Sequence, residues 1–435
     1  MKENDSDDEF LQHLQRNSFG YFVHEVDRRN GLVLDKTADD WPASIAAVGM
    51  GLTAYPVGVE RGFMARAEGA ERTLTTLRFL ATSEQGDAAD ATGCRGFYYH
   101  FLDMQSGRRA WRSELSSIDT ALLIAGALAA AAYFDAADAV ESEIRAIATR
   151  LYERVEWDWM LQGGATLCHG WRPEAGAGFL PYRWEGYDEA LILYLLALGS
   201  PTHPIPPECY RAWCSTYEWK ESYGIDYLHA GPLFIHQLSH IWVDFRGIAD
   251  AYMREKQSDY FENSRRATRV QQQYGARNPL GLAHRSERCW GVSASDGPGP
   301  AVRTIDGIER VFYDYIARGA PEGPDDGTLA PWAVVASLPF APEIVMPTLR
   351  NFRELKVRVA NPYGFKASIN PLFPAQGDDD GIGWVSRFHF GINEGPTVLM
   401  IENHRSGLIW NLMRRCGPLV RGLRAAGFEG GWLDG

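Results

Sequence analysis

Apolar residues recur every three or four positions along most of this chain, the spacing that gathers side chains on one face of an α-helix. The segments with this spacing are residues 10–26, 43–57, 64–82, 118–134, 140–160, 187–198, 207–217, 241–253, 259–274, 330–337, 342–352 and 396–413. Only 96–101 and 165–169 are candidates for short strands. The sequence therefore predicts an all-α protein of about a dozen helices.

Long glycine- and proline-rich connections separate these helices at 87–95, 162–180, 295–327 and 361–382. Loops of such length in a compact domain usually carry function. No low-complexity linker interrupts the chain, and no repeat of fixed period supports the alternative of an all-α solenoid. We therefore expect residues 1–435 to form a single (α/α)6 barrel, or toroid, with long loops forming a cleft at one end. The acidic residues 1–9 are expected to be a disordered tail.

The charge of the chain excludes several classes of partner. The net charge is −13, whereas nucleic acids and anionic membranes attract basic surfaces. No apolar run is long enough to span a membrane, and the N-terminal residues carry no hydrophobic signal region. We expect neither nucleic acid nor a membrane as partner. The expected location is cytoplasmic, or periplasmic or secreted if an export signal was removed.

Aromatic residues are abundant, with 14 Trp and 19 Tyr. Their flat faces suit the C–H faces of sugar rings, although most aromatic residues in any protein serve packing. The six cysteines contain no C-x-x-C pair, so they are expected to be buried thiols, with a disulfide unsupported. This composition favours a carbohydrate ligand without identifying one.

Two adjacent acids, Asp188 and Glu189, precede an apolar stretch that ends at Gly199. A carboxyl group at the first turn of a buried helix is raised in pKa by burial and lowered by the helix N-terminus. Glu189 is therefore a candidate general acid flanked by the aromatic residues Trp184 and Tyr187. The alternative is that Glu189 only caps the helix.

Three further acids lie in helix starts or loops. Asp119 follows Ser116 and Ser117, either of which would be a good N-cap, so Asp119 is expected in the first turn of a helix. Asp296 lies in a loop with a Gly-Pro turn, and Glu394 precedes Pro396, which is expected to start a helix. Each could instead cap or stabilise its own turn.

Motifs for other chemistries are missing from the sequence. There is no phosphate-binding glycine loop, no G-x-S-x-G and no H-E-x-x-H. His236 and His240 have the i, i+4 spacing of a metal pair, but only Asp244 follows on that face, which favours a hydrogen-bonding or sugar-contacting role. We expect no metal and no cofactor. Carboxylates without a cofactor motif are typical of glycoside hydrolases, which pair one protonated acid with one carboxylate.

Several motifs in one order resemble the bacterial glucoamylase-like proteins that include the endo-β-1,2-glucanases of glycoside hydrolase family 144. The resemblance extends from about residue 19 to 428. It is carried by G-Y-D-E at 186–189, S-P-T-H-P at 200–204, G-P-L-F at 231–234, C-W-G at 289–291, A-S-D at 294–296, D-G at 326–327, A-P at 330–331, Y-G-F at 363–365 and M-I-E-N at 400–403. It implies an (α/α)6 barrel and a β-glucan substrate, with β-1,2 linkages as the first expectation, and Glu189 and Asp119 match acids of the family.

The chain also departs from this resemblance. The β-1,2-glucanases have further acids before the Asp119 position, where this chain has Arg112 and Ser116. They have an Asp where this chain has Asn393, and an amide cannot act as a base. Their histidine after P-L-F falls on Gln237, beside His236. The departures suggest a sister group whose linkage or mechanism differs.

From these observations we predict a glycoside hydrolase acting on β-glucan, and specifically on β-1,2-glucan or its oligosaccharides, with Glu189 as general acid. Asp119 is the leading second carboxylate, with Glu394 and Asp296 as rivals. The alternatives are a β-1,2-glucan transglycosylase and a non-catalytic glycan-binding relative. The sequence leaves the oligomeric state open. The residues expected to bind the oligo- or polysaccharide substrate are Trp111, Trp184, Tyr187, His236, Trp290 and Arg318.

Overall fold

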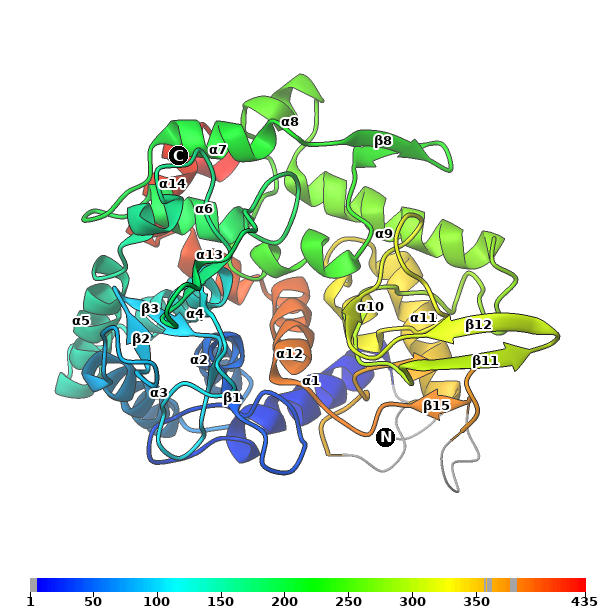
Figure 1. Ribbon diagram of the computed structural model, residues 1–435, viewed down its shortest axis with the longest axis horizontal. Helices are drawn as coiled ribbons and strands as arrows, with labels where there is room; N and C mark the ends of the chain where they lie inside the picture. The colour runs from blue at the N-terminus through cyan, green and yellow to red at the C-terminus, as the bar shows by residue number, and fades with distance from the viewer. Residues whose placement is uncertain (1–5, 356, 358–361, 376–381) are drawn as a thin grey trace.

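The computed structural model describes residues 6–355, 357, 362–375 and 382–435 and is built mainly from helices (Figure 1). This confirms the helical class. The helices are α1 (Asp7–His24), α2 (Ile45–Glu60), α3 (Arg66–Thr82), α4 (Ser117–Tyr133), α5 (Ala139–Glu153), α6 (Leu191–Leu198), α7 (Pro207–Cys214), α8 (Ala251–Glu255), α9 (Tyr260–Arg277), α10 (Pro331–Ala336), α11 (Pro342–Glu354), α12 (Gly391–Arg405), α13 (Leu408–Met413) and α14 (Gly417–Ala425), with short 3-10 helices η1 (Trp157–Leu161), η2 (Leu233–His236), η3 (Leu238–Ile241) and η4 (Gly431–Leu433).

The helices form an inner and an outer layer. Helices α2, α4, α6, α10 and α12 are buried over almost their whole surface, as expected for helices that are apolar on all sides. Helix α2 packs against α4 and α12, α4 against α6, and α10 against α12. The segment η2–η3 contacts both α6, where Ser239 Oγ accepts from Ile192 N–H, and α10, where Gln237 Nε2 donates to the Ala333 carbonyl.

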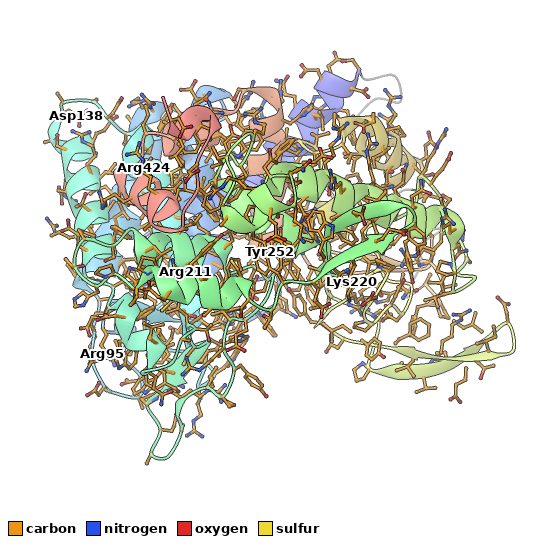
Figure 2. All side chains as sticks on the ribbon, turned by 90° about the horizontal axis from the view of Figure 1, so that it is seen from above. Arg95, Asp138, Arg211, Lys220, Tyr252 and Arg424 are labelled. Carbon is orange, nitrogen blue, oxygen red and sulfur yellow. The ribbon has the colours of Figure 1, made fainter. Side chains whose placement is uncertain are left out.

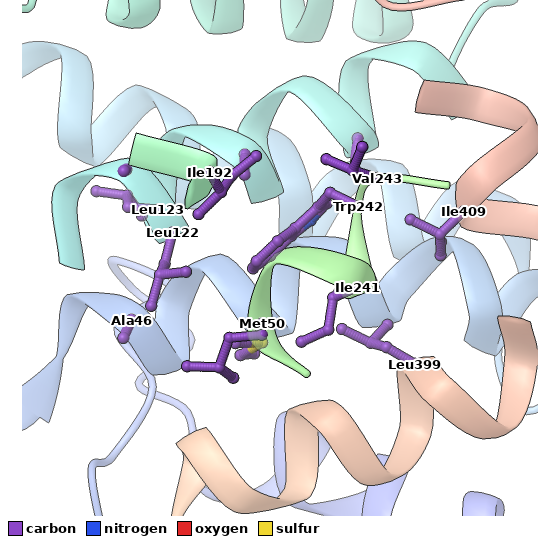
Figure 3. Packing of buried hydrophobic residues seen from close by; sticks show 14 of the residues in the cluster. Ala46, Met50, Leu122, Leu123, Ile192, Ile241, Trp242, Val243, Leu399 and Ile409 are labelled. Carbon is purple, nitrogen blue, oxygen red and sulfur yellow. The ribbon is translucent and has the colours of Figure 1, made fainter. Parts of the chain in front are cut away.

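The outer helices cover this inner layer. Helix α1 packs on α12 and α2. Helices α3 and α5 pack on each other, and α3 also packs on α2 and α5 on α4. Helix α14 packs on α6, α9 on η2 and α11 on α10. Each buries one face only, as an amphipathic helix does. Between the layers lies one continuous core, in which Trp242 is surrounded by side chains from α2, α4, α6 and α12 (Figure 3). Its indole N–H donates to Thr53 Oγ1 of α2 at 3.0 Å.

Short strands make small sheets at the ends of the helices. They are β1 (Ala43–Ser44), β2 (Gly93–Cys94), β3 (Phe97–Tyr99), β4 (Phe101–Leu102), β5 (Leu115–Ser116), β6 (Gly170–Arg172), β7 (Gly178–Phe179), β8 (Trp219–Ser222), β9 (Ile225–Leu228), β10 (Ala294–Ser295), β11 (Ala301–Ile305), β12 (Ile308–Phe312), β13 (Ile316–Ala317), β14 (Ile369–Asn370) and β15 (Trp384–Val385). Five of them form one sheet in the order β2-β3-β5-β6-β7. Strand β1 leads directly into α2 and β5 into α4, so this β-structure positions helix starts. The hairpin of β11 and β12 extends away from the body in two perpendicular views (Figures 1 and 2).

Several predicted boundaries are wrong for identifiable reasons. Residues 241–253 do not form one helix, because Arg246 folds back onto Asp244 and Gly247 adopts a left-handed φ of 74°. Pro396 lies inside α12, which begins at Gly391. The predicted strand at 165–169 begins instead at Gly170, whereas 96–101 does contain β3.

The N-terminal segment is partly ordered. Helix α1 begins at Asp7, where the Ser6 hydroxyl accepts from Glu9 N–H and the Glu9 carboxylate accepts from Ser6 N–H. This capping box contradicts the expected disorder over residues 6–9. Residues 1–5 of the expected tail lie outside the described residues. Within the described chain, no helix combines the length and apolar character needed to cross a bilayer.

Helices α2 and α4 approach each other through two glycines. A Cβ atom added at Gly126 would lie 2.1 Å from the Gly49 carbonyl oxygen, and one at Gly49 would lie 2.4 Å from the Leu122 carbonyl oxygen. Both neighbours are backbone atoms, which cannot rotate away as a side chain can. The contact therefore fixes the distance between the two helices that carry Ser44 and Asp119.

We predict that Gly126→Ala lowers the free energy of unfolding by about 1–3 kcal/mol, because the added methyl group forces the two backbones apart. The measurement is urea denaturation followed by circular dichroism. Gly86→Ala is the matched control, since a Cβ at Gly86 meets no atom within 4 Å. Equal stability of the two variants would contradict the close contact.

Candidate active site

The N-terminal ends of the inner helices open into one cavity of about 580 Å³. Its wall includes Ser44 and Ala46 at the start of α2, Ile118 and Asp119 at the start of α4, Trp332 at the start of α10, and Ile392 and Asn393 at the start of α12. Glu189 lies in the turn just before α6 and also lines this cavity. Helix N-termini carry partial positive charge, so this arrangement favours carboxylates in the wall. Further residues that line it are Asp35, Lys36, Trp41, His100, Phe101, Glu114, Ser116, His169, Leu180, Trp184, Phe234, Leu238, Ala294, Asp296, Asp314, Tyr315, Ala317 and Phe390.

The carboxyl group of Glu189 is held largely away from water. Burial raises its pKa to about 8, and the nearby negative charges of Asp119 and Asp188 act in the same direction. Helix α6 begins at Leu191, so Glu189 lies just before the helix. The sequence had instead predicted a position in its first turn. At neutral pH most Glu189 side chains therefore keep their proton.

Asp188 has a different role from its neighbour. Its Oδ1 accepts hydrogen bonds from Ala190 N–H at 2.9 Å and from Trp213 Nε1–H at 3.2 Å, and it is absent from the cavity wall. Burial raises the pKa of Asp188 to about 7. Asp188 thus bonds the backbone just before α6, whereas Glu189 lines the cavity.

Asp119 lies in the first turn of α4, as the sequence predicted. Ser116 is the N-cap: its Oγ accepts from Asp119 N–H at 3.1 Å and donates to Asp119 Oδ2 at 2.6 Å. Asp119 is buried and lines the cavity close enough to Glu189 for its charge to act on the pKa of that group. The two acids that the sequence singled out first therefore face the same cavity.

His100 and Glu114 belong to this site and were missed by the sequence analysis. The backbone pairing of His100 N–H with the Glu114 carbonyl brings the two residues together at the edge of β5. His100 Nδ1 lies 2.9 Å from Glu114 Oε1 and 3.6 Å from Asp119 Oδ2, and its ring stacks on Phe101 at 3.9 Å. His100 lies in the predicted strand 96–101 and Glu114 lies between predicted elements, so only the strand register reveals their contact.

The charges of this cluster depend on one another. Burial opposes protonation of His100, but the negative charges of Asp119 and Glu114 outweigh it and raise the pKa of His100 to about 9. Burial would raise the pKa of Glu114, but its hydrogen bond to His100 outweighs that effect and lowers the pKa to about 2. At neutral pH a protonated imidazolium thus lies between two carboxylates.

His100, Glu114 and Asp119 are also the donor types that bind divalent metal ions. Their ligand atoms lie within 4.8 Å of one another. However, His100 Nδ1 is already directed at both carboxylates, so a metal ion would have to replace the proton that Nδ1 shares with them. These three side chains are thus of types that bind metal ions, but their arrangement is explained by a protonated His100 that contacts both carboxylates.

The rival carboxylates have different environments. Asp296 lines the cavity and accepts a 2.7 Å hydrogen bond from Ser386 Oγ, and burial raises its pKa. Glu394 is absent from the cavity wall and lies 2.8 Å from His389 Nδ1. The adjacent Asn393 faces the cavity in its place. This geometry keeps Asp296 as a candidate and disfavours Glu394.

Two of the predicted aromatic residues lie at the cavity. Trp184 is in the wall, where its ring stacks on His169 at 3.8 Å and its Nε1–H donates to Ser117 Oγ. Trp111 is 54% exposed and contacts Trp41, a wall residue, edge to face at 4.5 Å. Trp111 therefore lies at the rim.

Tyr187, His236 and Trp290 are not in the cavity wall, in contrast to the sequence prediction. Trp290 is fully buried in the core. The His236 ring packs against Tyr187 and Tyr227, and its Nε2 is 3.1 Å from the Ala230 carbonyl oxygen. Burial lowers the pKa of His236 to about 4, so it is neutral. All three residues belong to aromatic packing that the sequence could not distinguish from a sugar platform.

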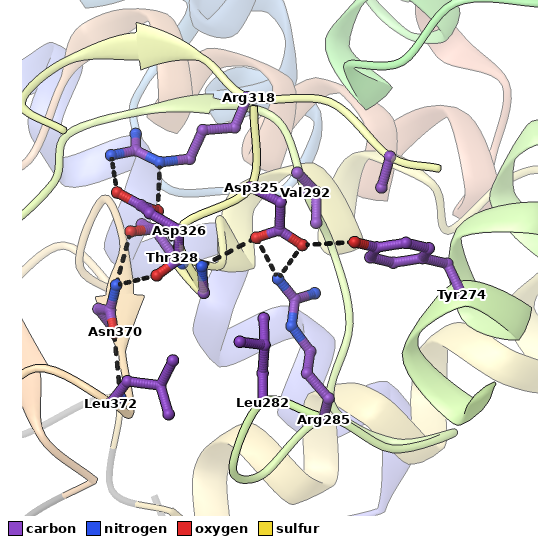
Figure 4. A network of polar contacts seen from close by, with 12 residues as sticks. Tyr274, Leu282, Arg285, Val292, Arg318, Asp325, Asp326, Thr328, Asn370 and Leu372 are labelled. Carbon is purple, nitrogen blue, oxygen red and sulfur yellow. Dashed lines mark hydrogen bonds and ion pairs between the residues drawn. The ribbon is translucent and has the colours of Figure 1, made fainter. Parts of the chain in front are cut away.

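Arg318 likewise has a structural role. Its guanidinium forms a two-pronged ion pair with the Asp326 carboxylate, with Nε and Nη2 donating at 2.8 and 2.9 Å (Figure 4). Arg318 also donates to the carbonyl oxygens of Ser295, Tyr313 and Asp314. It is fully buried and contacts no cavity surface, so it holds in place the loops that present Asp296 and Asp314.

Comparison with known proteins agrees with this architecture. The glycoamylase family model, described as "Putative glucoamylase", matches residues 181–417, and the chain belongs to this family. A crystal structure of a putative glucoamylase from Bacteroides uniformis is 30% identical, with a TM-score of 0.85 over 99% of this chain and 100% of that one. The resemblance inferred from the motifs is thereby confirmed.

Two further matches come from Parabacteroides distasonis. One is the exo beta-1,2-glucooligosaccharide sophorohydrolase (non-reducing end), 28% identical over 96% of this chain and 58% of its own length. The other is the crystal structure of a beta-1,2-glucanase, 27% identical, with a TM-score of 0.84 over 97% of this chain and 60% of that one. In both matches, this chain thus spans somewhat more than half the length of the matched protein.

The charge on His100 predicts a pH dependence of stability. Folding raises its pKa from 6.5 to about 9, so its charge stabilises the folded state fully below about pH 6.5, and this contribution is lost as the pH rises through 9. We predict that His100→Gln lowers the Tm at pH 6 and that the difference from wild type narrows by pH 9.5. Differential scanning calorimetry at several pH values measures the Tm difference between this variant and the wild type. A difference that stays constant with pH would contradict the imidazolium.

Proposed function

We propose that this protein is a glycoside hydrolase that acts on β-glucan, most specifically on β-1,2-linked glucan or its oligosaccharides, with Glu189 as general acid. The names of the matched sophorohydrolase and beta-1,2-glucanase of Parabacteroides distasonis support this substrate class. The cavity volume of about 580 Å³ lies in the range of about 300–1,000 Å³ that holds small ligands.

The observation that carries the proposal is a protonated acid and a second carboxyl group at one cavity. Glycosidases need one acid that protonates the leaving oxygen and one carboxylate on the reacting sugar. The raised pKa of Glu189 supplies the first, and Asp119, hydrogen-bonded by Ser116 and close to the charged His100, is suited to the second. Different environments for two acids are the usual basis of such a division.

In the proposed reaction, the bond between the anomeric carbon and the glycosidic oxygen breaks while that oxygen takes the proton of Glu189. If Asp119 acts as a base, water adds to the anomeric carbon and gives its proton to Asp119. If Asp119 first attacks the anomeric carbon to form a glycosyl–Asp119 ester, water then displaces Asp119 from that carbon and gives its proton to the Glu189 carboxylate. Asp296 remains a rival for the second carboxylate. His100 touches neither reacting bond and would position Asp119.

The proposal includes the architecture. We infer that α2, α4, α6, α10 and α12, with η2–η3 in the sixth place, are the inner ring of an (α/α)6 barrel. We also infer that residues 1–435 act as one catalytic domain, because wall residues extend in sequence from Asp35 to Asn393. The contacts between neighbouring inner elements support both inferences.

We predict that Glu189→Gln lowers kcat at least about 10³-fold, because an amide cannot donate the proton, while glucan binding persists. Purified protein is incubated with linear and cyclic β-1,2-glucan and with β-1,3, β-1,4, β-1,6 and α-linked glucans, and the products are resolved by chromatography. Glu185→Gln is the matched control, because this nearby carboxylate is exposed and absent from the wall.

Near-full activity of Glu189→Gln would exclude Glu189 as the acid. Longer products formed at the expense of shorter ones would identify a transglycosylase, and tight binding without any product would identify a glycan-binding protein. Products from another glucan alone would move the substrate away from β-1,2 linkages.

The pH profile gives an independent test. An acid whose pKa is raised to about 8 is protonated below that pH and loses its proton above it. We therefore predict that kcat/KM of the wild type falls tenfold per pH unit above about pH 8. Initial rates at pH 5–10 measure this limb. A rate already falling at pH 5 would place the essential acid elsewhere.

A further inference from the structure

Two residues of the cavity wall each carry a buried hydrogen-bond donor that has no partner among the described residues. The donors are Nε1 of Trp332, in the first turn of α10, and Nδ2 of Asn393, in the first turn of α12. Trp332 is 6% exposed and Asn393 is 2% exposed. Leaving a buried donor without a partner costs about 1–3 kcal/mol, so two such groups at one cavity point to a ligand that would satisfy them.

The two donors and the two candidate acids lie on different pairs of packed helices. Helices α10 and α12 pack against each other, and α4 and α6 pack against each other. Asp119 starts α4 and Glu189 precedes α6, whereas Trp332 and Asn393 start α10 and α12. A sugar in the cavity would thus have the acids along one part of its surface and the two neutral donors along another.

The remainder of the wall indicates what chemistry the ligand has. Six carboxyl side chains line the cavity, against Lys36 and the imidazolium of His100 as cations and no arginine within the described wall. Such a wall repels anionic ligands such as sugar phosphates and uronic acids. Neutral hydroxyl groups accept from Trp332 and Asn393 and donate to the carboxylates. The six are Asp35, Glu114, Asp119, Glu189, Asp296 and Asp314.

We propose that Trp332 Nε1–H and Asn393 Nδ2–H bind hydroxyl oxygens of a neutral sugar unit in this cavity and help to determine specificity for it. The inference rests on the proposed function and extends it to two residues outside the acid pair. It also gives a reason for an amide at position 393: an Asp there could only accept, and would add a negative charge to a wall that already holds six carboxyl groups.

The test measures binding without turnover, in Glu189→Gln protein, by isothermal titration calorimetry with linear β-1,2-linked glucotriose and glucopentaose. Trp332→Phe keeps an aromatic ring and removes the N–H, and Asn393→Asp keeps the shape and removes the donor. We expect each change to weaken binding about tenfold, the usual size of one hydrogen bond. Asn393→Ala should weaken it similarly, which separates loss of the donor from the added charge.

Trp290→Phe is the matched control. Its Nε1 is also buried and lacks a partner among the residues described, but it lies in the core and not in the cavity wall. It should leave the dissociation constant unchanged. Circular dichroism verifies that every variant is folded.

The outcomes separate this inference from the proposed function. If Glu189→Gln protein binds the oligosaccharides and the variants at Trp332 and Asn393 bind as tightly, the inference is overturned while the proposed function stands. If Glu189→Gln protein binds no glucan of any linkage, the proposed function is overturned and the inference with it.

Discussion

The close packing of α2 against α4 determines where the site can be. Gly49 and Gly126 allow the two backbones to touch, and no larger residue fits either position without displacing backbone atoms. The caps of these helices, Ser44 and Ser116, both reach the cavity wall. Because α6 and α12 pack on α4 and α2, their N-terminal ends are brought to the same end of the core. A short interhelical distance at two glycines is thus the basis for a cavity walled by helix starts.

Such a wall suits carboxyl groups but does not make them alike. Glu189 lacks a strong partner among the described residues and keeps its proton because burial and neighbouring negative charge raise its pKa. Asp119 is hydrogen-bonded by its own N-cap and lies beside a positive imidazolium. One acid that donates and one that accepts can therefore coexist within a single cavity, as the proposed hydrolysis requires.

The departures from the β-1,2-glucanases have structural counterparts. Ser116, where those enzymes have an acid, caps α4 and donates to Asp119. Arg112 is exposed and pairs with Glu174 at 3.4 Å, away from the wall. Asn393 faces the cavity, and its neighbour Glu394 is held by His389. Glu394 does not line the cavity although Asn393 does, because consecutive residues of a helix point in directions about 100° apart.

Sequence alone determined the features that depend on local spacing. The helical class, most helix positions and the placement of Asp119 one turn inside α4 follow from apolar periodicity and capping preferences that act within a few residues. The conjunction of Glu189 and Asp119 was predicted through family resemblance, since no spacing rule connects residues 70 positions apart.

Only the tertiary structure decided which polar and aromatic residues surround that conjunction. His100 meets Glu114 because two strands pair in one register, and Trp332 and Asn393 line the same cavity because α10 packs on α12. Trp290, His236 and Arg318 are residue types that suit a sugar-binding site. In the structure, however, Trp290 and His236 are buried by packing and Arg318 forms a buried ion pair. Composition and local sequence pattern do not reveal such contacts, because the contacts form between distant segments only when the core packs together.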